Sequence, residues 1–374
     1  MHIVDTDIHV RELPGELAEH CEMPWRVALE AIPESAPTAS FGSSLGDYYV
    51  PGLAQGSGDG SEPLWPGGQN RPMLVTSPSQ CRQDLDAMGI ESAILFPDLL
   101  LKLAIQANGD YAMALARAYN RWLIAKWLKT EGFFGALCIT PQDPEGSAEE
   151  IRELGKKDKM VCVYLPTAGV NPLYGHKKYY PIYEAAQEVG IPVSLHGLAM
   201  IHPVFPCQTE QFDEIGRHGF GHSLEMAVNF FHLMCNGIPV RFPELRVSFN
   251  EGGVAWVPWM MMRLNNEYLE WRGRLLPFFK ERPSHYLKNF RFSTHPVEEP
   301  ENPADYQKIL DLISSFTGNY DNIIYASDWP HHDFCPPTRI FNFPMPEDVK
   351  RRVMGENAAE FFNIPVRVNS HGRV

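Results

Sequence analysis

The feature that most constrains the fold is a regular alternation of short apolar runs with longer amphipathic segments from residue 79 onward. Short runs rich in β-branched residues predict strands, and longer amphipathic segments predict helices. One more apolar run, at the start of the chain, brings the number of expected strands to eight. They span residues 2–10, 92–97, 133–141, 160–167, 191–197, 245–253, 290–296 and 323–330.

Helical patterns lie between these runs and after the last of them. They cover residues 106–130, 143–158, 178–189, 222–236, 256–271, 303–316 and 346–362. Eight strands that each lead into a helix are the count for a closed parallel barrel. An open doubly wound sheet usually has fewer strands and a Gly-rich first turn, and no G-x-G-x-x-G follows any expected strand. The sequence therefore predicts an α/β protein with one (β/α)8 TIM barrel over residues 1–374.

Residues 30–78 interrupt the alternation. They are rich in Gly, Pro and Ser and lack the spacing of a helix, so we interpret them as a long insertion after the first strand. A loop in this place leaves from the C-terminal end of a strand, where barrel enzymes carry out their chemistry. We expect a lid that carries Tyr48, Tyr49 and Trp65; a surface loop or a subunit contact is the alternative.

Composition excludes several classes of protein. The 46 acidic and 32 basic residues give a formal charge of −14, which repels nucleic acid. No apolar stretch is long enough for a membrane span, and the first residues do not resemble a signal peptide. The cysteines are 7 in number and form no Cys-x-x-Cys pair, so a disulfide framework or a thiolate zinc site is not indicated. We expect a cytoplasmic protein.

Side chains that can bind a metal end four of the expected strands. Asp7 and His9 alternate on one face of the first strand, His196 ends the fifth, Glu251 the sixth and Asp328 the eighth. Taken singly, each has a structural explanation, such as a buried core histidine or a turn carboxylate. Together at the mouth of a barrel they predict a metal site, and nitrogen and oxygen ligands without thiolate suit zinc, manganese or iron.

These residues resemble the amidohydrolase-related metal-dependent hydrolases, in the branch that contains aminocarboxymuconate-semialdehyde decarboxylase and the nonoxidative aromatic acid decarboxylases. The resemblance rests on VDTDIHV, VSLHG, RFPELRVSFNEGGVAWVPWMMMRLN, YASDWPHHD and GENAAEFFNI in this order. It implies that Asp7, His9, His196 and Asp328 bind a divalent metal. The family usually has a histidine on the sixth strand, where this chain has Glu251, which we expect to act as a base or to bind a second ion.

The resemblance leaves the number of ions open, at one or two. Binuclear relatives often use a modified lysine at the end of the fourth strand, and this chain has none there.

Further residues near the strand ends are candidates for substrate binding. His222 and His232 lie in the helix after the fifth strand, His295 ends the seventh strand, and Trp256 follows Glu251. Each has a structural alternative, as a hydrogen-bonded histidine or as part of the buried face of a helix. His331 matches a family-like S-D-x-P-H run and is expected to support a ligand rather than to bind the metal itself.

A basic run offers a contact for the phosphates of an acyl-CoA, although a solvated face is the simpler interpretation. It comprises Lys280, Arg282, His285, Lys288 and Arg291.

The favoured function is metal-dependent hydrolysis of an amide, ester, lactone or thioester, as in a thioesterase, on a small-molecule substrate. Asp328 or Glu251 removes a proton from the attacking water. The alternative is nonoxidative decarboxylation of an aromatic or unsaturated acid, with Asp328 protonating carbon. The missing histidine on the sixth strand is the reason to prefer hydrolysis. A metal-binding scaffold without catalysis is a third hypothesis, and the family relatives imply a homodimer.

Overall fold

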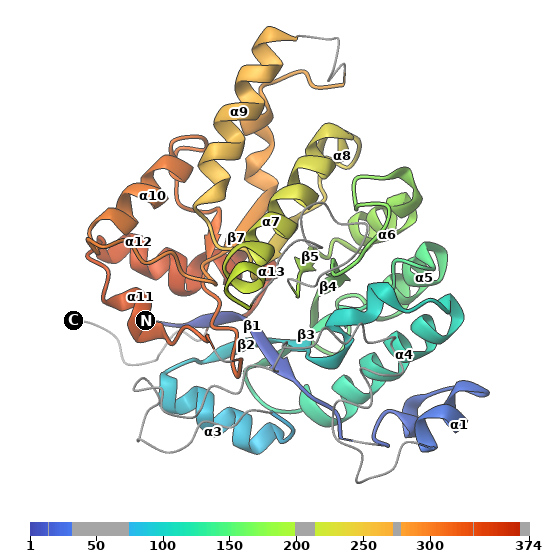
Figure 1. Cartoon of the computed structure of the whole chain (residues 1–374). Coiled ribbons are helices and arrows are strands. Elements are labelled where there is room, and N and C mark those ends of the chain that lie inside the picture. The colour runs from blue at the N-terminus through green and yellow to red at the C-terminus, as the bar shows by residue number, and fades with distance from the viewer. Residues whose placement is uncertain (14, 32–74, 199–213, 272–277, 332, 367–374) are drawn as a thin grey trace.

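A computed structural model describes residues 1–13, 15–31, 75–198, 214–271, 278–331 and 333–366. The strands form one parallel sheet of 8 strands in the order β1-β2-β3-β4-β5-β6-β7-β8. They run through the middle of the molecule, and helices surround them (Figure 1). The predicted (β/α)8 TIM barrel is confirmed.

All eight predicted strands are present, several with shorter bounds. They are β1 (Val4–Val10), β2 (Ser92–Pro97), β3 (Phe133–Cys138), β4 (Met160–Pro166), β5 (Val193–His196), β6 (Val247–Asn250), β7 (Phe290–Ser293) and β8 (Ile323–Ile324). The largest differences are at the ends of β6 and β8. Glu251 and Asp328 have φ values of 56° and 63°, and this left-handed conformation is incompatible with a continued strand.

The helices lie where the amphipathic segments predicted them, with four additions. They are α1 (Trp25–Glu30), α3 (Pro78–Met88), α4 (Gly109–Trp122), α5 (Pro144–Leu154), α6 (Tyr180–Val189), α7 (Glu214–Cys235), α8 (Ile238–Arg241), α9 (Trp256–Glu270), α10 (Asp305–Ser314), α11 (Pro337–Phe341), α12 (Glu347–Arg351) and α13 (Asn357–Phe362). α1, α3, α8 and α11 are the additions. α7 begins before the predicted residue 222. The sequence does not predict its first turns because they hold three glycines, which weaken the helical signal.

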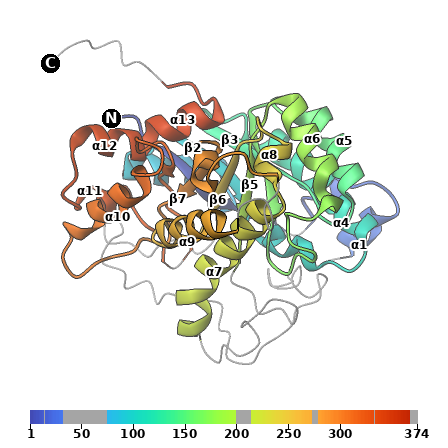
Figure 2. The ribbon, with the colours of Figure 1, turned by 90° about the horizontal axis from the view of Figure 1, so that it is seen from above.

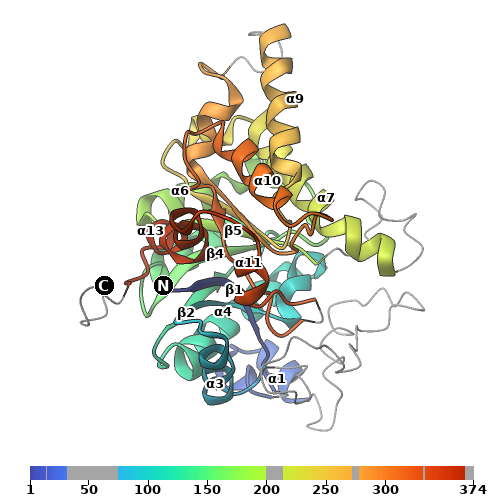
Figure 3. The same cartoon turned by 90° about the vertical axis from the view of Figure 1, so that its left-hand side faces the viewer.

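An aromatic cluster fixes α7 and α9 against the barrel. The ring of Phe230 in α7 lies 5.6 Å from Phe249 in β6, 5.7 Å from Phe292 in β7 and 5.6 Å from Trp256 in α9, between ring centroids. Edge-to-face packing at such distances is favourable. This cluster sets the position of the two helices that follow β5 and β6, and both extend beyond the strands (Figures 2 and 3).

The barrel closes where β1 meets the chain after β8. The Asp328 amide donates to the Asp7 carbonyl at 3.0 Å, and the His9 amide donates to the Trp329 carbonyl at 2.8 Å. The buried Asp5 side chain reinforces this seam, because its Oδ1 accepts from the amides of Asp7 at 3.1 Å and Ser327 at 3.0 Å. The seam therefore fixes the backbone at three of the predicted metal ligands.

Residues 32–74 of the predicted insertion, with Tyr48, Tyr49 and Trp65, lie outside the described residues, whereas its two end residues belong to α1 and α3. The flanking helices α1 and α3 pack on the barrel through buried Leu29 and Leu85. Among the described helices, none is both long and apolar enough to span a membrane.

Replacing Asp5 tests the seam. Asp5→Leu leaves two buried amide donors without acceptors, so we expect a loss of about 2–4 kcal/mol in the free energy of unfolding, measured by chemical denaturation. Asp5→Asn keeps an acceptor oxygen and should lose much less. Equal losses in the two variants would show that the hydrogen bonds to Oδ1 do not hold the seam.

Candidate metal centre

Four of the predicted ligands meet at the C-terminal mouth of the barrel. Asp7 and His9 come from β1, His196 is the last residue of β5, and Asp328 follows β8. One ligand atom of each lies within 4.8 Å of the others, and all four side chains are buried. His196 Nε2 is 3.0 Å from Asp7 Oδ1, and His9 Nε2 is 3.0 Å from Asp328 Oδ1.

Backbone carbonyls orient the two imidazoles. His9 Nδ1 lies 3.0 Å from the Pro97 carbonyl oxygen, and His196 Nδ1 lies 2.8 Å from that of Gly197. When Nδ1 carries the hydrogen that it donates to a carbonyl, the lone pair on Nε2 is free to bind a cation. Both Nε2 atoms face Asp7, so the two rings present their lone pairs to one place.

The donor set fits a divalent cation. Two imidazole nitrogens and two carboxylates suit manganese, iron or zinc. Asp7 Oδ2 is buried and has no hydrogen-bond partner among the described residues. An ionised oxygen in such surroundings is costly unless positive charge compensates it. A cation held by Asp7, His9, His196 and Asp328 would supply that charge.

The charges of the four residues strongly shift one another's pKa values. Burial by itself raises the pKa of Asp7, but His196 and His9 lower it to about 2. Burial and the charge of His331 lower the pKa of His9, but the carboxylates of Asp328 and Asp7 raise it to about 10. Without metal, the imidazole of His9 therefore holds a proton at neutral pH.

Asp328 is the most heavily contacted carboxylate of the site. Its Oδ1 lies 2.8 Å from His331 Nδ1, and its Oδ2 lies 3.3 Å from His295 Nε2. Burial would raise the pKa of this carboxyl, but the charges of His331 and His295 hold it well below its usual range. The left-handed backbone at Asp328 is uncommon for a non-glycine residue, and such conformations persist where the surroundings impose them.

Glu251 stands beside the four-residue group and contacts an imidazole from α7. Its Oε2 is 3.4 Å from His196 Nδ1 and 3.1 Å from His222 Nδ1. Glu251 also forms a group with Asp328 and His331, in which one ligand atom of each lies within 4.8 Å of the others. Glu251 thus has an imidazole beside it that comes from α7 and not from β6. The roles of Glu251 as base or ligand stay predictions.

Several polar residues of the site were missed by the sequence analysis. Asp98 follows β2 and pairs with Arg11 at 2.6 Å between Oδ2 and Nε, and Asp333 Oδ2 lies 3.2 Å from His295 Nε2. Glu225 lies one turn after His222 in α7 and is buried, which raises the pKa of its carboxyl. The rule of a polar side chain after an apolar run would have found Asp98, because the sequence reads SAILFPD.

Two of the predicted substrate-binding residues, His232 and Trp256, form hydrogen bonds with the backbone. His232 lies ten residues beyond His222, about 15 Å along the helix, and its Nδ1 accepts from the Gly175 amide at 3.0 Å. The Trp256 indole donates to the carbonyls of Gly252 at 3.0 Å and Gly253 at 3.1 Å. Both roles in substrate binding stay predictions.

The last residue of the basic run, Arg291, lies far from the C-terminal mouth of the barrel. Arg291 lies near the N-terminal end of β7, the end opposite to the metal centre, and its guanidinium covers the ring of Phe361 at 4.8 Å from the centroid. This position gives no support to a contact between Arg291 and a ligand at the mouth.

The metal content of variants tests whether the four-residue group alone holds the ion or whether Glu251 is also a ligand. We expect one manganese ion per chain in wild-type protein loaded with manganese, about none in His196→Ala, and one in Glu251→Gln, measured by elemental analysis after dialysis. The reason is that Glu251 is not a member of the four-residue group. Two ions in wild type that fall to one in Glu251→Gln would contradict this and make Glu251 a ligand of a second ion.

The affinity for metal should rise with pH. The pKa of His9 is raised to about 10 in the metal-free protein, so this imidazole is protonated at neutral pH and must lose its proton to bind a cation. For each proton released, the dissociation constant falls about tenfold per pH unit below that pKa. Titration calorimetry between pH 6 and 8, in two buffers of different ionisation enthalpy, measures the slope and the protons released. A flat profile with no proton release would contradict the protonated state.

Several solved structures have a similar fold. The fold is similar to that of 5-carboxyvanillate decarboxylase from Sphingomonas paucimobilis, with a TM-score of 0.70, 19% identity and coverage of 97% of this chain and 99% of that one. It is also similar to 2,6-dihydroxybenzoate decarboxylase from Rhizobium, with a TM-score of 0.68, 19% identity and coverage of 97% and 99%. A third similar structure is dihydroxybenzoic acid decarboxylase from Polaromonas sp. JS666 with manganese and the inhibitor 2-nitroresorcinol. Its TM-score is 0.67, with 18% identity and 99% of each chain covered.

At the level of sequence, no curated protein matches the chain. The family model Amidohydro_2, described as amidohydrolase, matches residues 92–364, which is more than half of the chain. The chain therefore belongs to the amidohydrolase family.

Proposed function

We propose that this protein is a manganese-dependent decarboxylase of aromatic acids that carry a hydroxyl group beside the carboxylate. The observation that carries the proposal is the contact between His222 and Glu251 at the mouth. Hydrolysis was preferred because the sixth strand lacks a histidine. Because α7 brings the imidazole of His222 next to Glu251, the mouth does not lack a histidine beside this carboxylate, and the choice rests on the other features of the site.

The solved structures of similar fold support decarboxylation. By their descriptions they are decarboxylases of 5-carboxyvanillate, 2,6-dihydroxybenzoate and dihydroxybenzoic acid, all substituted benzoates, and one of them holds manganese. Hydrolysis has support at the level of the family description alone. One fold can host several chemistries, so the choice between decarboxylation and hydrolysis depends on the residues of the site and is tested by an assay.

Asp7, His9, His196 and Asp328 would hold the divalent cation, which would supply positive charge to oxygens of the bound substrate. The remaining chemistry belongs to side chains of the mouth. His222 lies beside the cluster and can donate a hydrogen bond to a substrate oxygen. Glu251 holds the His222 imidazole in place, at 3.1 Å between Oε2 and Nδ1.

Asp328 moves the proton. Its low pKa leaves the carboxylate ionised when substrate arrives, so it accepts the proton of the neighbouring hydroxyl. It then delivers this proton to the ring carbon that bears the carboxylate. The bond from that carbon to the carboxylate breaks, its electron pair restores the aromatic ring, and carbon dioxide leaves. The ionised oxygen of the product takes a proton from solvent on release.

The assay measures carbon dioxide from a panel of ortho-hydroxybenzoates, with release of alcohol, amine or thiol from esters, amides and thioesters measured in parallel. In deuterium oxide, the product of decarboxylation carries one deuterium at the carbon that lost the carboxylate. Release of alcohol, amine or thiol without carbon dioxide would establish hydrolysis instead. Turnover of neither class by metal-loaded protein would favour a scaffold that binds metal without catalysis.

Replacement of Asp328 tests its role. Asp328→Asn keeps a carbonyl oxygen but cannot carry the proton, so we expect kcat to fall about 10²–10⁴-fold, the usual contribution of a general acid or base. Metal content of the variant is measured alongside, because Asp328 is also a predicted ligand. The matched control is Asp86→Asn on α3, whose carboxylate pairs with Arg82 on the surface. A metal-loaded Asp328→Asn variant with wild-type kcat would refute the proton transfer.

A further inference from the structure

The turn between β6 and α9 has a backbone conformation that its own residues do not impose. It reads Glu251-Gly252-Gly253. Glu251 and Gly253 have φ values of 56° and 65°, in the left-handed region. A residue with a Cβ atom is unstable in this region unless its surroundings hold it there. The contacts of the turn therefore decide where the carboxylate of Glu251 lies.

The chain at the end of β7 supplies some of these contacts. The Glu251 amide donates to Ser293 Oγ at 3.1 Å, and the Gly253 amide donates to the His295 carbonyl at 2.9 Å. Ser293 Oγ donates to the same carbonyl at 3.2 Å. The first and the last residue of the turn are thus both bonded to β7 and the residues that follow it.

Glu298, a few residues farther along, holds the chain that continues from the turn. Its Oε1 accepts from the amides of Val254 at 2.7 Å and Ala255 at 2.6 Å. α9 begins at Trp256, and Ala255 at its N-cap position forms no side-chain hydrogen bond. Glu298 therefore takes the role of the helix cap from another loop, and a negative charge is also favourable at the N-terminus of a helix.

The contact of Glu298 with this segment is close. A Cβ atom at Gly253 would lie 2.5 Å from Glu298 Oε1 and 2.9 Å from the Pro296 carbonyl oxygen, so this position requires glycine. Val254 is buried, and water cannot easily replace the carboxylate at its amide. Loss of the Glu298 carboxylate would leave a buried donor without an acceptor, and the turn would have to move to satisfy it.

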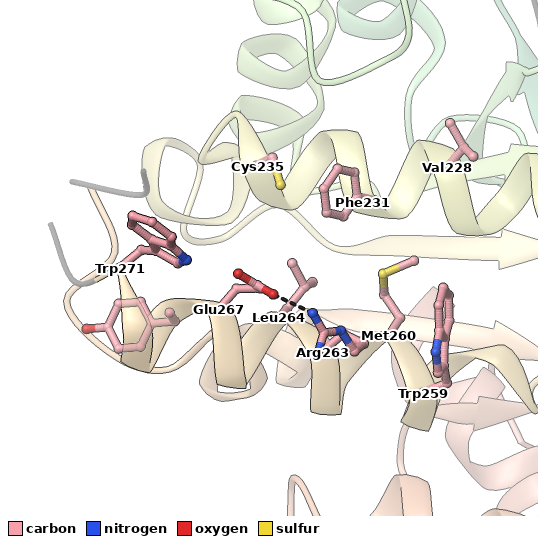
Figure 4. A pocket seen from close by; sticks show the side chains of 10 residues that line it. Val228, Phe231, Cys235, Trp259, Met260, Arg263, Leu264, Glu267 and Trp271 are labelled. Carbon is pink, nitrogen blue, oxygen red and sulfur yellow. Dashed lines mark hydrogen bonds and ion pairs between the residues drawn. The ribbon is translucent and has the colours of Figure 1, made fainter. Parts of the chain in front are cut away.

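The later turns of α9 do not fix its start in the same way. Side chains of α7 and α9 face each other across an apolar pocket of about 630 Å³, with Phe231 on one wall and Met260 and Leu264 on the other (Figure 4). Unfilled space between two helices leaves their relative positions less restricted than close packing does. The start of α9 is therefore positioned by the ring contacts of Trp256 and by Glu298.

The position of the turn matters because Glu251 contacts a different element. Its Oε2 lies 3.1 Å from His222 Nδ1, which belongs to α7. Hydrogen bonds from nitrogen to oxygen weaken beyond about 3.2 Å, so a shift of the turn by about 1 Å would break this contact.

We propose that Glu298 is a positioning residue of the active site, which holds the turn after β6 so that Glu251 faces His222. The inference rests on the proposed function, in which His222 binds an oxygen of the substrate and Glu251 holds the imidazole. Glu298 acts through Glu251 and takes no part in the proton transfer.

The first experiment follows the His222 imidazole by NMR and needs no substrate. The protein is loaded with zinc, whose filled d shell does not broaden the signals. The ring signal of His222 is assigned by its loss in His222→Gln. We expect Glu298→Ala to shift this signal in the same direction as Glu251→Gln does. Glu298→Gln keeps an acceptor oxygen for both amides and should leave the signal near its wild-type position.

The second experiment measures carbon dioxide release from ortho-hydroxybenzoates by manganese-loaded protein. Glu298→Ala should lower kcat/KM about 10–100-fold, the effect of a small misplacement in an active site, with manganese content unchanged. Glu298→Gln should recover most of this loss. In a Glu251→Gln background, Glu298→Ala should cause no further loss, because its effect passes through Glu251.

Asp143→Ala is the matched control. Asp143 caps α5, where its side chain accepts from the Gly146 amide at 3.0 Å. Its loss should lower the midpoint of chemical denaturation, as the loss of Glu298 does, because each removes a helix cap. The His222 signal and kcat/KM should keep their wild-type values in Asp143→Ala. Circular dichroism of each variant checks that it is folded.

Three outcomes overturn the proposal. They are an unmoved His222 signal in folded Glu298→Ala, losses in kcat/KM that multiply in the double variant, and an equal loss of kcat/KM in Asp143→Ala. If Glu298→Ala does not fold, Glu298→Asp, shorter by one methylene, takes its place. If wild type releases no carbon dioxide from any ortho-hydroxybenzoate, the proposed function fails, and the His222 signal by itself still decides the role of Glu298.

Discussion

The seam between β1 and β8 is the constraint on which the rest of the structure depends. β8 contributes two residues of regular strand, so the barrel is closed by the hydrogen bonds of the irregular chain that follows it. These bonds join the backbones of Asp7 and Asp328, and of His9 and Trp329. Three of the residues that close the barrel, Asp7, His9 and Asp328, are therefore also predicted metal ligands. An error in the closure would separate the ligands from one another.

The second constraint is the concentration of buried charge at the mouth. Asp7, Asp328 and Glu251 lie among imidazoles in a place with almost no access to water. Isolated buried carboxylates are costly, and the contacts with histidine compensate part of that cost. A bound cation would compensate the rest, and protons on the imidazoles would take its place in the metal-free protein. Metal binding would therefore also stabilise the fold.

Periodicity along the chain was sufficient to predict the architecture. Strands such as β2, β4 and β5 read as short apolar runs because both of their faces are buried, and a closed barrel follows from the count of eight. The bounds were harder to predict where the backbone leaves the extended region. The predicted strand over 323–330 ends at Ile324, because its later residues bond to Asp7, His9 and Val353 outside a regular strand pair. Hydrogen bonds of this kind produce no periodic pattern in the sequence from which the end of the strand could be predicted.

What the sequence alone determined was the set of side chains that end the strands, since parallel strands of a barrel must deliver their C-terminal residues to one mouth. Asp7, His9, His196 and Asp328 meet there for that reason. The tertiary structure decided what surrounds them. His222 reaches Glu251 from α7, 29 positions away in the sequence, through the packing of one helix on the barrel. Distances between side chains on different elements depend on packing angles and helix positions, and these are properties of the folded chain that local patterns do not encode.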